Sequence, residues 1–323
     1  MEEKRLQCRV ITPMFSYGAY KEKEPELRTT ELKGAMRYVY RMICHAPLNI
    51  LAKDEAELFG GAAERSRQEE GHASPVYLAM RGEVHDTNGT LLLHKPQHFK
   101  ENPVMKYFDR GSFEVIVRLN ACIKRKRVLG GQIIDLNWYA DFVELTLLLY
   151  GMGRRSRKGR GRVSVTGREY DSESQALHWL CTAFNRFSSV SSWKRSESYK
   201  IIGNEILACN DCSRLKRPVL QKVKIGRKLE ACDITRYLGA VDLAGHDAKA
   251  GKLSEAQKAS TGSVGSRLGS PLIISFLQTT GGYFPIYIFV KGIRKRELID
   301  SDFEYREMFI SEVEKIMRGG RNR

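Results

Sequence analysis

Two segments of the chain carry apolar residues in patterns that predict helices. In residues 31–44 (ELKGAMRYVYRMIC) the apolar positions recur at helical spacing and form one face, which predicts an amphipathic helix. Thr29 or Thr30 can cap its start, and Glu31 falls in the first turn, where the helix dipole favours an anion. Residues 135–151 (DLNWYADFVELTLLLYG) are apolar on nearly all sides, so we expect this helix to be buried and to end at its final glycine.

Four strands are predicted around these two helices. Residues 6–15 precede the first helix, and residues 75–84 and 111–120 lie between the helices, separated by a long polar insertion. A basic loop at 150–163 follows the second helix, and a short strand at 162–167 follows the loop. The order strand, helix, strand, strand, helix, strand is the split βαβ pattern of a ferredoxin-like domain.

The second half of the chain contains the same kinds of segment in a less regular order. Residues 245–266 are polar and rich in Gly and Ser, which predicts a mobile link. We expect an α+β protein with two ferredoxin-like (RRM-like) βαββαβ domains, residues 1–166 and a degenerate second copy in residues 167–323. In this half we predict helices at 173–187, 229–243 and 302–317, and strands at 204–209, 218–226, 270–279 and 283–292.

The composition narrows the class of protein. Apolar residues make up 42% of the 323 residues, so folded cores are expected. Lys and Arg number 54 against 38 Asp and Glu, and the resulting charge of +16 favours contact with phosphates or an acidic surface. Seven cysteines at scattered spacings do not resemble a secreted disulfide framework. The N-terminus lacks a hydrophobic signal core and no apolar run approaches roughly 20 residues, so we expect a cytosolic (cytoplasmic) protein.

The loop at 150–163 (YGMGRRSRKGRGRV) carries the strongest charge signal, because it holds six cations and four glycines without an acid. It could cradle a phosphate, with backbone N–H groups brought close by the glycines, or line a groove for single-stranded RNA. It could also be a solvated loop that only keeps the protein soluble. It is not a P-loop, because the GxxxxGK[ST] order is absent and the loop follows a helix. The six cations are Arg154, Arg155, Arg157, Lys158, Arg160 and Arg162.

Three further cations lie four residues apart on the first predicted helix. Lys33, Arg37 and Arg41 therefore follow one line of its surface. They would extend the electropositive surface of the loop if the helix lies beside it, and otherwise they form an ordinary solvated face.

Sites for metal or acid–base chemistry are weakly indicated. Cys209 and Cys212 form one CxxC, but a structural zinc site needs four ligands, and Cys232 and His246 could complete it only by chance of folding. His45 follows the first helix and could act as a general acid or base near RNA phosphates, or could simply face water or the helix-end carbonyls. The residues alone thus indicate a basic nucleic-acid-binding protein without a catalytic centre.

Several segments together resemble the RAMP (repeat-associated) subunits of CRISPR effectors, most of all the first subunit of the type III-B Cmr complex. They are TPMF, ELKGAMRYVYR, ELFGG, GMGRRSRKGRGRV and SRLGSPLIISF, in this order. The family's helix has a small residue and then an arginine, matched here by Gly34 and Arg37. Its LFG motif is matched by Leu58, Phe59 and Gly60. Its glycine-rich loop is matched by Gly151, Gly153, Arg154, Arg155, Arg157, Gly159 and Gly161.

This resemblance implies a non-catalytic subunit with two ferredoxin-like domains and no cofactor. Its partners would be guide RNA, target single-stranded RNA and the other Cmr effector subunits. The RNA-binding residues would be the six loop cations together with Lys33, Arg37 and Arg41, and Arg267 would contribute from the second domain. Two positions depart from the family: Arg160 replaces a common aromatic or apolar residue, and Gly61 replaces a common serine.

Two enzymatic alternatives remain. A metal-independent endoribonuclease of the same superfamily would use His45 as acid or base, with arginines stabilising the scissile phosphate. Such processing enzymes have the glycine-rich loop near the C-terminus, whereas here it lies in mid-sequence. A nucleotide-binding signalling enzyme would need clustered carboxylates for magnesium, and the sequence contains no such cluster.

Overall fold

The computed structural model describes most of the chain, and the structural statements below refer to those residues. They are 2–18, 24–61, 71–93, 95, 103–120, 127–191, 193, 198–212, 214–250, 262, 269–294, 297–299 and 303–319.

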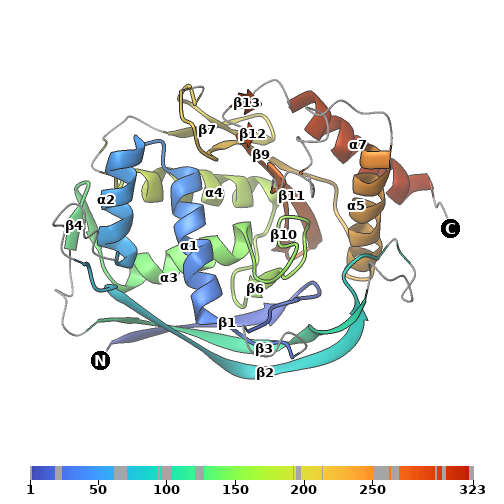
Figure 1. Ribbon diagram of the computed structural model, residues 1–323, viewed down its shortest axis with the longest axis horizontal. Helices are drawn as coiled ribbons and strands as arrows, with labels where there is room; N and C mark the ends of the chain where they lie inside the picture. The colour runs from blue at the N-terminus through green and yellow to red at the C-terminus, as the bar shows by residue number, and fades with distance from the viewer. Residues whose placement is uncertain are drawn as a thin grey trace.

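The first sheet is formed by the N-terminal half of the chain and lies along the bottom of Figure 1. Its strand order is β2-β3-β1-β6, and every neighbouring pair is antiparallel. Alternate residues such as Cys8 and Val115 are buried on the face turned to the helices, while Arg5 and Glu114 pair on the other face. The strands are β1 (Glu3–Val10), β2 (Val76–Thr90), β3 (Val104–Leu119) and β6 (Val163–Val165).

A layer of helices separates this sheet from a second one (Figure 1). α3 contacts β1 and β3 on one side and β10 of the second sheet on the other, which explains why its sequence is apolar almost all round. The helices of this layer are α1 (Thr29–Ile43), α2 (Leu48–Phe59), α3 (Leu136–Leu149) and α4 (Glu173–Ser188).

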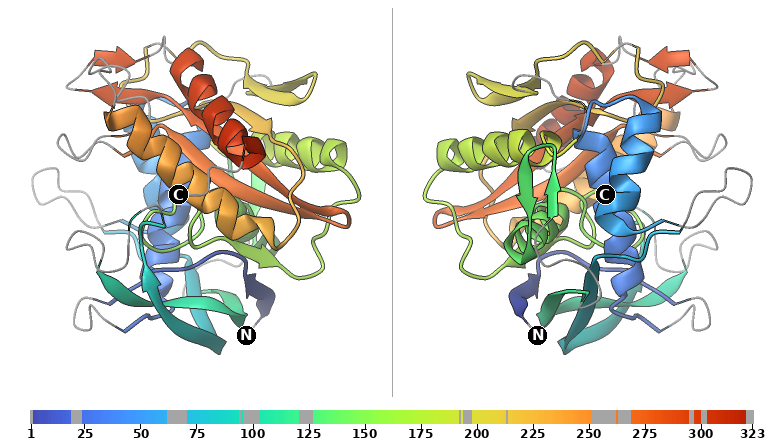
Figure 2. Two further views of the ribbon diagram at one scale, coloured as in Figure 1. Left: turned by 90° about the vertical axis from the view of Figure 1, so that its right-hand side faces the viewer. Right: turned by 90° about the vertical axis from the view of Figure 1, so that its left-hand side faces the viewer.

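The second sheet has the order β10-β11-β9-β8-β7 and is covered on both faces. Ile273 of β10 belongs to the large core shared with α1, α3 and α4, whereas Ile274 belongs to a smaller core with α5 and α7. Figure 2 shows α5 and α7 side by side on the outside of this sheet. The elements are β7 (Tyr199–Ile202), β8 (Glu205–Ala208), β9 (Leu220–Ile225), α5 (Asp233–Ala250), β10 (Leu272–Thr279), β11 (Gly282–Val290) and α7 (Phe303–Gly319).

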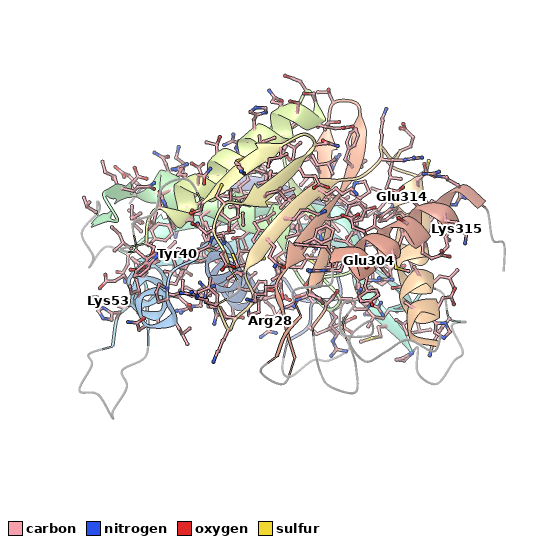
Figure 3. All side chains as sticks on the ribbon, turned by 90° about the horizontal axis from the view of Figure 1, so that it is seen from above. Arg28, Tyr40, Lys53, Glu304, Glu314 and Lys315 are labelled. Atoms are coloured by element: carbon pink, nitrogen blue, oxygen red, sulfur yellow. The ribbon has the colours of Figure 1, made fainter. Side chains whose placement is uncertain are left out.

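Two small hairpins complete the described elements. They are β4 (Arg127–Leu129) with β5 (Gln132–Ile134), and β12 (Gly292–Arg294) with β13 (Glu297–Ile299). Seen from above, Lys53 of α2 and Lys315 of α7 lie at opposite ends of the molecule (Figure 3). No helix among the described residues is long and apolar enough to cross a membrane.

Most of the predicted helices and strands are confirmed, but their ends differ, and one helix and several short strands, β7 among them, were not predicted. The pattern does not predict α2, because its apolar face includes Asp54, which is buried and accepts a hydrogen bond from Ser191 Oγ at 2.7 Å. β2 and β3 continue into the polar segment between them, since backbone pairing extends beyond the residues that face the core. α5 extends through 245–250, and nearly all of the predicted link beyond it lies outside the described residues.

The predicted helix ends have mixed outcomes. α1 begins at Thr29 with Arg28 at its N-cap and no side-chain cap, so the predicted threonine cap is wrong. Gly151 follows the end of α3 with a φ of 65°, in the left-handed conformation that terminates helices, as predicted.

Candidate nucleic-acid interface

The glycine-rich loop, residues 150–163, folds back on itself between α3 and β6. The N–H of Met152 donates to the carbonyl of Gly161 at 2.9 Å. Gly161 has a φ of 63°, and a Cβ built there would lie 1.5 Å from the Met152 oxygen. Only glycine fits this crossing, because both the backbone conformation and the lack of space exclude a side chain.

The loop is bonded to the segment that follows β1 and to the start of α1. The N–H of Gly161 donates to Pro13 O, and the N–H of Arg154 donates to Phe15 O, each at 2.9 Å. The N–H of Gly153 donates to Glu31 Oε1 at 2.6 Å. The TPMF segment and the first turn of α1 therefore hold the loop in place.

The other side of the loop lies along the edge of the second sheet. The N–H of Ile274 in β10 donates to Arg157 O at 3.1 Å, and Arg157 Nη1 donates to Ser270 O at 3.1 Å. A Cβ at Gly269 would lie 2.6 Å from that Nη1 atom, so the glycine makes room for the arginine. The loop thus joins the two halves of the chain.

An acid from the second half supplies the counter-charge that the loop lacks locally. Asp242 of α5 has a fully buried carboxylate that pairs with Arg155 Nη2 at 2.6 Å and Arg160 Nη2 at 2.6 Å. Its oxygens also accept from Arg160 Nη1 at 3.2 Å and from the N–H of Leu93 at 3.0 Å. One carboxylate therefore joins the loop, α5 and the residues after β2.

Arg160 and Arg162, two of the predicted RNA contacts, are only 1% exposed. Arg162 Nη2 donates to Ser156 O at 2.6 Å and to Ile274 O at 2.5 Å. Burial without a paired carboxylate lowers the pKa of Arg162 to about 9. Both side chains stabilise the loop from inside and cannot reach a phosphate in this conformation.

Arg157 and Lys158 are half-buried against aromatic rings. The Arg157 guanidinium lies 4.8 Å from the ring centroid of Tyr38, and burial raises the pKa of that tyrosine to about 12. Lys158 Nζ lies 4.7 Å from the ring centroid of Phe309 in α7. These cation–π contacts leave both side chains only partly accessible.

Arg154 is the one exposed side chain among the six loop cations. Its Cζ lies 5.2 Å from the ring centroid of Tyr17, which is itself buried. No carboxylate in the described part of the chain pairs with its guanidinium.

Two of the α1 cations, Arg37 and Arg41, pair with an acid of α2. Arg37 Nη1 and Arg41 Nε pair with the two carboxylate oxygens of Glu55 at 2.9 and 3.3 Å. Arg37 Nη2 also donates to the carbonyls of Phe59 and Gly60 at 2.9 and 2.5 Å, so the LFG motif and its arginine are direct partners. Glu55 thus offsets part of the positive charge of these two arginines.

Lys33 lies in the same line and is partly buried. Its Nζ donates to the carbonyl of Val76 at 3.5 Å, and burial, with the nearby Arg37, lowers its pKa. Arg267, the remaining predicted RNA contact, lies outside the described residues.

His45 is buried, 7% exposed, between α1 and the second sheet. Its Nε2 lies 3.0 Å from Tyr199 Oη and 3.8 Å from Cys212 Sγ, and its Nδ1 lies 3.4 Å from Asn210 Nδ2. These contacts are those of a side chain that stabilises the fold. The burial of His45 argues against the hypothesis that it acts as an acid or base on RNA.

A zinc site at Cys209 and Cys212 has no geometric support among the residues that the structure describes. They contain no group of three or more His, Cys, Asp or Glu side chains that could hold a metal ion. Cys212 is buried beside His45, whereas Cys209 and Cys232 are exposed and His246 pairs with Asp247.

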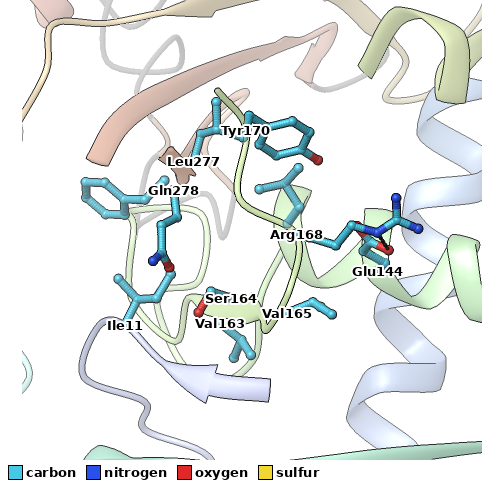
Figure 4. A pocket seen from close by; sticks show the side chains of 11 residues that line it. Ile11, Glu144, Val163, Ser164, Val165, Arg168, Tyr170, Leu277 and Gln278 are labelled. Atoms are coloured by element: carbon cyan, nitrogen blue, oxygen red, sulfur yellow. Dashed lines mark ion pairs between the residues drawn. The ribbon is translucent and has the colours of Figure 1, made fainter. Parts of the chain in front are cut away.

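A small cavity lies where the first sheet meets β10 (Figure 4). Its volume is about 30 Å³, enough for one or two water molecules and too small for a nucleotide. Glu144 lines it and pairs with Arg168 Nε at 3.1 Å. Burial raises the pKa of Glu144 to about 7.

Three residues that organise the loop could not be recognised as such from the sequence. Tyr17 has no distinguishing pattern, and Asp242 lies 80 or more positions from its arginines, so neither gave a usable signal. Glu31 was placed correctly in the first turn of its helix, but its bond to Gly153 is a tertiary contact.

Comparisons with known proteins agree with the sequence motifs. The model of the RAMP superfamily matches residues 7–164. The apo structure of Cmr1 from Pyrococcus furiosus aligns with a TM-score of 0.54 at 15% identity, over 96% of both chains. No curated protein matches the chain.

Two cryo-EM structures of type III-B Cmr-beta bound to cognate target RNA contain similar chains. Their TM-scores are 0.52, for the complex that also holds AMPPnP in the presence of ssDNA, and 0.53. The identities are 10% and 9%, and the alignments cover 96% of this chain and 98% of each of the others. The family match and the shared fold confirm the resemblance drawn from the motifs: residues 7–164 match the RAMP superfamily, and the chain has a fold similar to that of Cmr1.

Proposed function

We propose that this chain is a non-catalytic, RNA-binding subunit of a type III-B CRISPR effector complex, helping to hold guide RNA and to capture target RNA. The observation that carries the proposal is the Cmr1-like fold along 96% of the chain, combined with a cationic glycine-rich loop inside the family match. The net charge of +16 supports a polyanionic partner. The complexes whose chains share this fold are themselves bound to target RNA.

The accessible cations of the loop would make the RNA contacts. Arg154 is exposed, Arg155 keeps 28% of its side chain accessible, and Arg157 and Lys158 are partly exposed. The buried arginines of the loop would hold its shape. Lys33, Arg37 and Arg41 remain secondary candidates, since the ion pairs with Glu55 satisfy two of them.

We also infer that both halves are ferredoxin-like, divided between residues 166 and 167. The order β2-β3-β1-β6 with antiparallel neighbours is the order expected from the split βαβ pattern. In the second half, β9, α5, β10, β11 and α7 follow the same sequence of elements, and β8 occupies the place of the fourth strand. The large core crosses the division and joins both halves.

The test is a titration of labelled single-stranded RNA with the full chain at several salt concentrations. The triple variant Arg154→Ala, Arg155→Ala, Arg157→Ala should bind more weakly, and the slope of log affinity against log salt should fall by about 0.7 for each lost phosphate contact. Arg227→Ala removes an exposed charge from the link before α5 and is the matched control. Equal affinity of all three proteins would overturn the assignment of the loop.

The same samples test the endoribonuclease alternative. Each RNA is run on a denaturing gel after the titration, and we expect it to remain intact. If the wild type cleaves the RNA at a fixed position and His45→Ala abolishes the cleavage, the chain is a processing enzyme and the proposal of a non-catalytic binding subunit is wrong. Because His45 is buried, the variant needs a thermal unfolding curve to show that it is folded.

A further inference from the structure

The guanidinium of Arg154 is a flat, exposed surface with an aromatic ring behind it. Its Cζ lies 5.2 Å from the centroid of Tyr17, within the range of a cation–π contact. The ring belongs to Tyr17, a residue that is only 8% exposed, so it covers one side of the guanidinium. The side chain as a whole is exposed, so its other face can meet a ligand.

Tyr17 is a fixed support. Its hydroxyl donates to the carbonyl of Lys106 in β3, and its own carbonyl accepts from Arg28 Nη1 at 2.7 Å. Its backbone forms a β-bridge with Pro25. The ring is therefore held from both ends of the residue, and its orientation does not depend on Arg154.

The backbone at Arg154 is equally constrained. Its own N–H donates to Phe15 O at 2.9 Å, and the preceding N–H donates to Glu31 Oε1 at 2.6 Å. The next residue, Arg155, has a φ of 59°, the one positive φ outside glycine among the described residues, and its side chain is held by Asp242 at 2.6 Å. Bonds on both sides thus fix the direction in which Arg154 leaves the loop.

We propose that Arg154, placed over the ring of Tyr17, is the position where one nucleobase of single-stranded RNA stacks. This rests on the proposed function and specifies what the loop recognises: the flat face of a base, without preference among bases, because every base has a π-face. Arginine guanidinium planes stack on unpaired bases in RNA recognition. A guanidinium already placed against a fixed ring loses less freedom when a base covers it.

A phosphate contact is the competing outcome, and the variant Arg154→Lys separates the two. Lysine keeps the charge but has no plane, so a phosphate contact survives the change and a stacked base does not. The residue is exposed, so the variant should fold like the wild type. The RNA probe is a 12-nucleotide single strand, tested intact and as a series in which each position in turn lacks its base.

If a base stacks on Arg154, Arg154→Lys should weaken binding of the intact RNA about tenfold while leaving the salt slope unchanged. Removing the base at one position should weaken binding by the wild type to the same extent. Combining that RNA with Arg154→Lys should cause no further loss, because both changes remove the same contact. Tyr17→Leu, checked by thermal unfolding, should reproduce part of the effect.

The two levels of the proposal fail differently. Base stacking at Arg154 is wrong if Arg154→Lys binds intact RNA as tightly as the wild type does. It is also wrong if the affinity lost in Arg154→Lys adds to the affinity lost with every abasic RNA. In both cases the proposal that the chain binds RNA stands. If the wild type binds none of the RNAs at any salt concentration, the proposed function fails and the stacking position with it.

Discussion

The outer tip and the inner side of the glycine-rich loop carry the same kind of residue in opposite surroundings. Arg154 at the tip is exposed, and its Cζ lies 5.2 Å from the ring centroid of Tyr17. Arg160 and Arg162 on the inner side are 1% exposed and contact Asp242 and main-chain carbonyls. The number of arginines in the loop therefore overstates the charge that a polyanion can reach.

The difference has a physical cause. A guanidinium removed from water must find a carboxylate or carbonyl oxygens, and the second half of the chain provides both. The inner arginines consequently connect the two halves, and Arg154 at the tip is the most accessible of the six loop cations. Variants of the two regions should separate these roles.

The largest effect is expected for Asp242→Ala. Removing this acid leaves the buried guanidinium of Arg160 and the half-buried one of Arg155 without a counter-charge, which should lower the free energy of unfolding by about 3–5 kcal/mol. Chemical denaturation measures the change. Asp247→Ala, on the same helix but 42% exposed, is the control and should change stability by less than about 0.5 kcal/mol. Similar losses in both variants would contradict the role of Asp242.

Gly161→Ala should be the next most damaging change. A Cβ would collide with the Met152 carbonyl and force a non-glycine residue to a φ of 63°, costing about 3 kcal/mol or more. Gly203→Ala has a similar φ of 58° and open space around it, so it carries the backbone strain alone, about 1–2 kcal/mol. Equal losses in the two unfolding curves would show that the loop can move away from the new side chain.

Glu144 of α3 is a second buried acid, outside the loop, and it pairs with one exposed arginine, Arg168, whereas Asp242 pairs with two arginines of the loop. Its pKa is raised to about 7 from 4.5, so the folded chain binds more protons than the unfolded chain between these values. Stability should therefore fall as pH rises from about 4.5 to 7, by on the order of 3 kcal/mol. Glu144→Gln should remove this part of the pH dependence of the melting temperature. An unchanged profile would mean that Glu144 is already ionised at low pH in the folded chain.

Arg154→Ala should have the smallest effect on folding, below about 0.5 kcal/mol, since its side chain is exposed. The same variant should weaken RNA binding, so stability and binding would respond to opposite regions of one loop. Thermal unfolding and RNA titration on one preparation measure both. If Arg154→Ala lowers the free energy of unfolding as much as Asp242→Ala does, the tip and the inner side do not have the separate roles described above.

Part of this arrangement was predictable, because it depends on local sequence. The apolar face of α1, the buried character of α3 and the stop at Gly151 follow from periodicity and from the conformational freedom of glycine. The N-cap residue of α1 was not predictable from residue type, since the position is occupied by Arg28 and not by a threonine. α2 was not predicted, because the burial of Asp54 depends on a hydrogen bond from Ser191, which is distant in the sequence.

By itself, the sequence determined the order of most helices and strands, the motifs of the RAMP superfamily and the presence of a cationic glycine-rich loop. Only the tertiary structure decided which of those cations are accessible. Asp242 of α5 pairs with Arg155 and Arg160 of the loop. Glu55 of α2 pairs with Arg37 and Arg41 of α1. The reason is that the desolvation of a charge depends on every segment packed around it, and those segments come from distant parts of the chain.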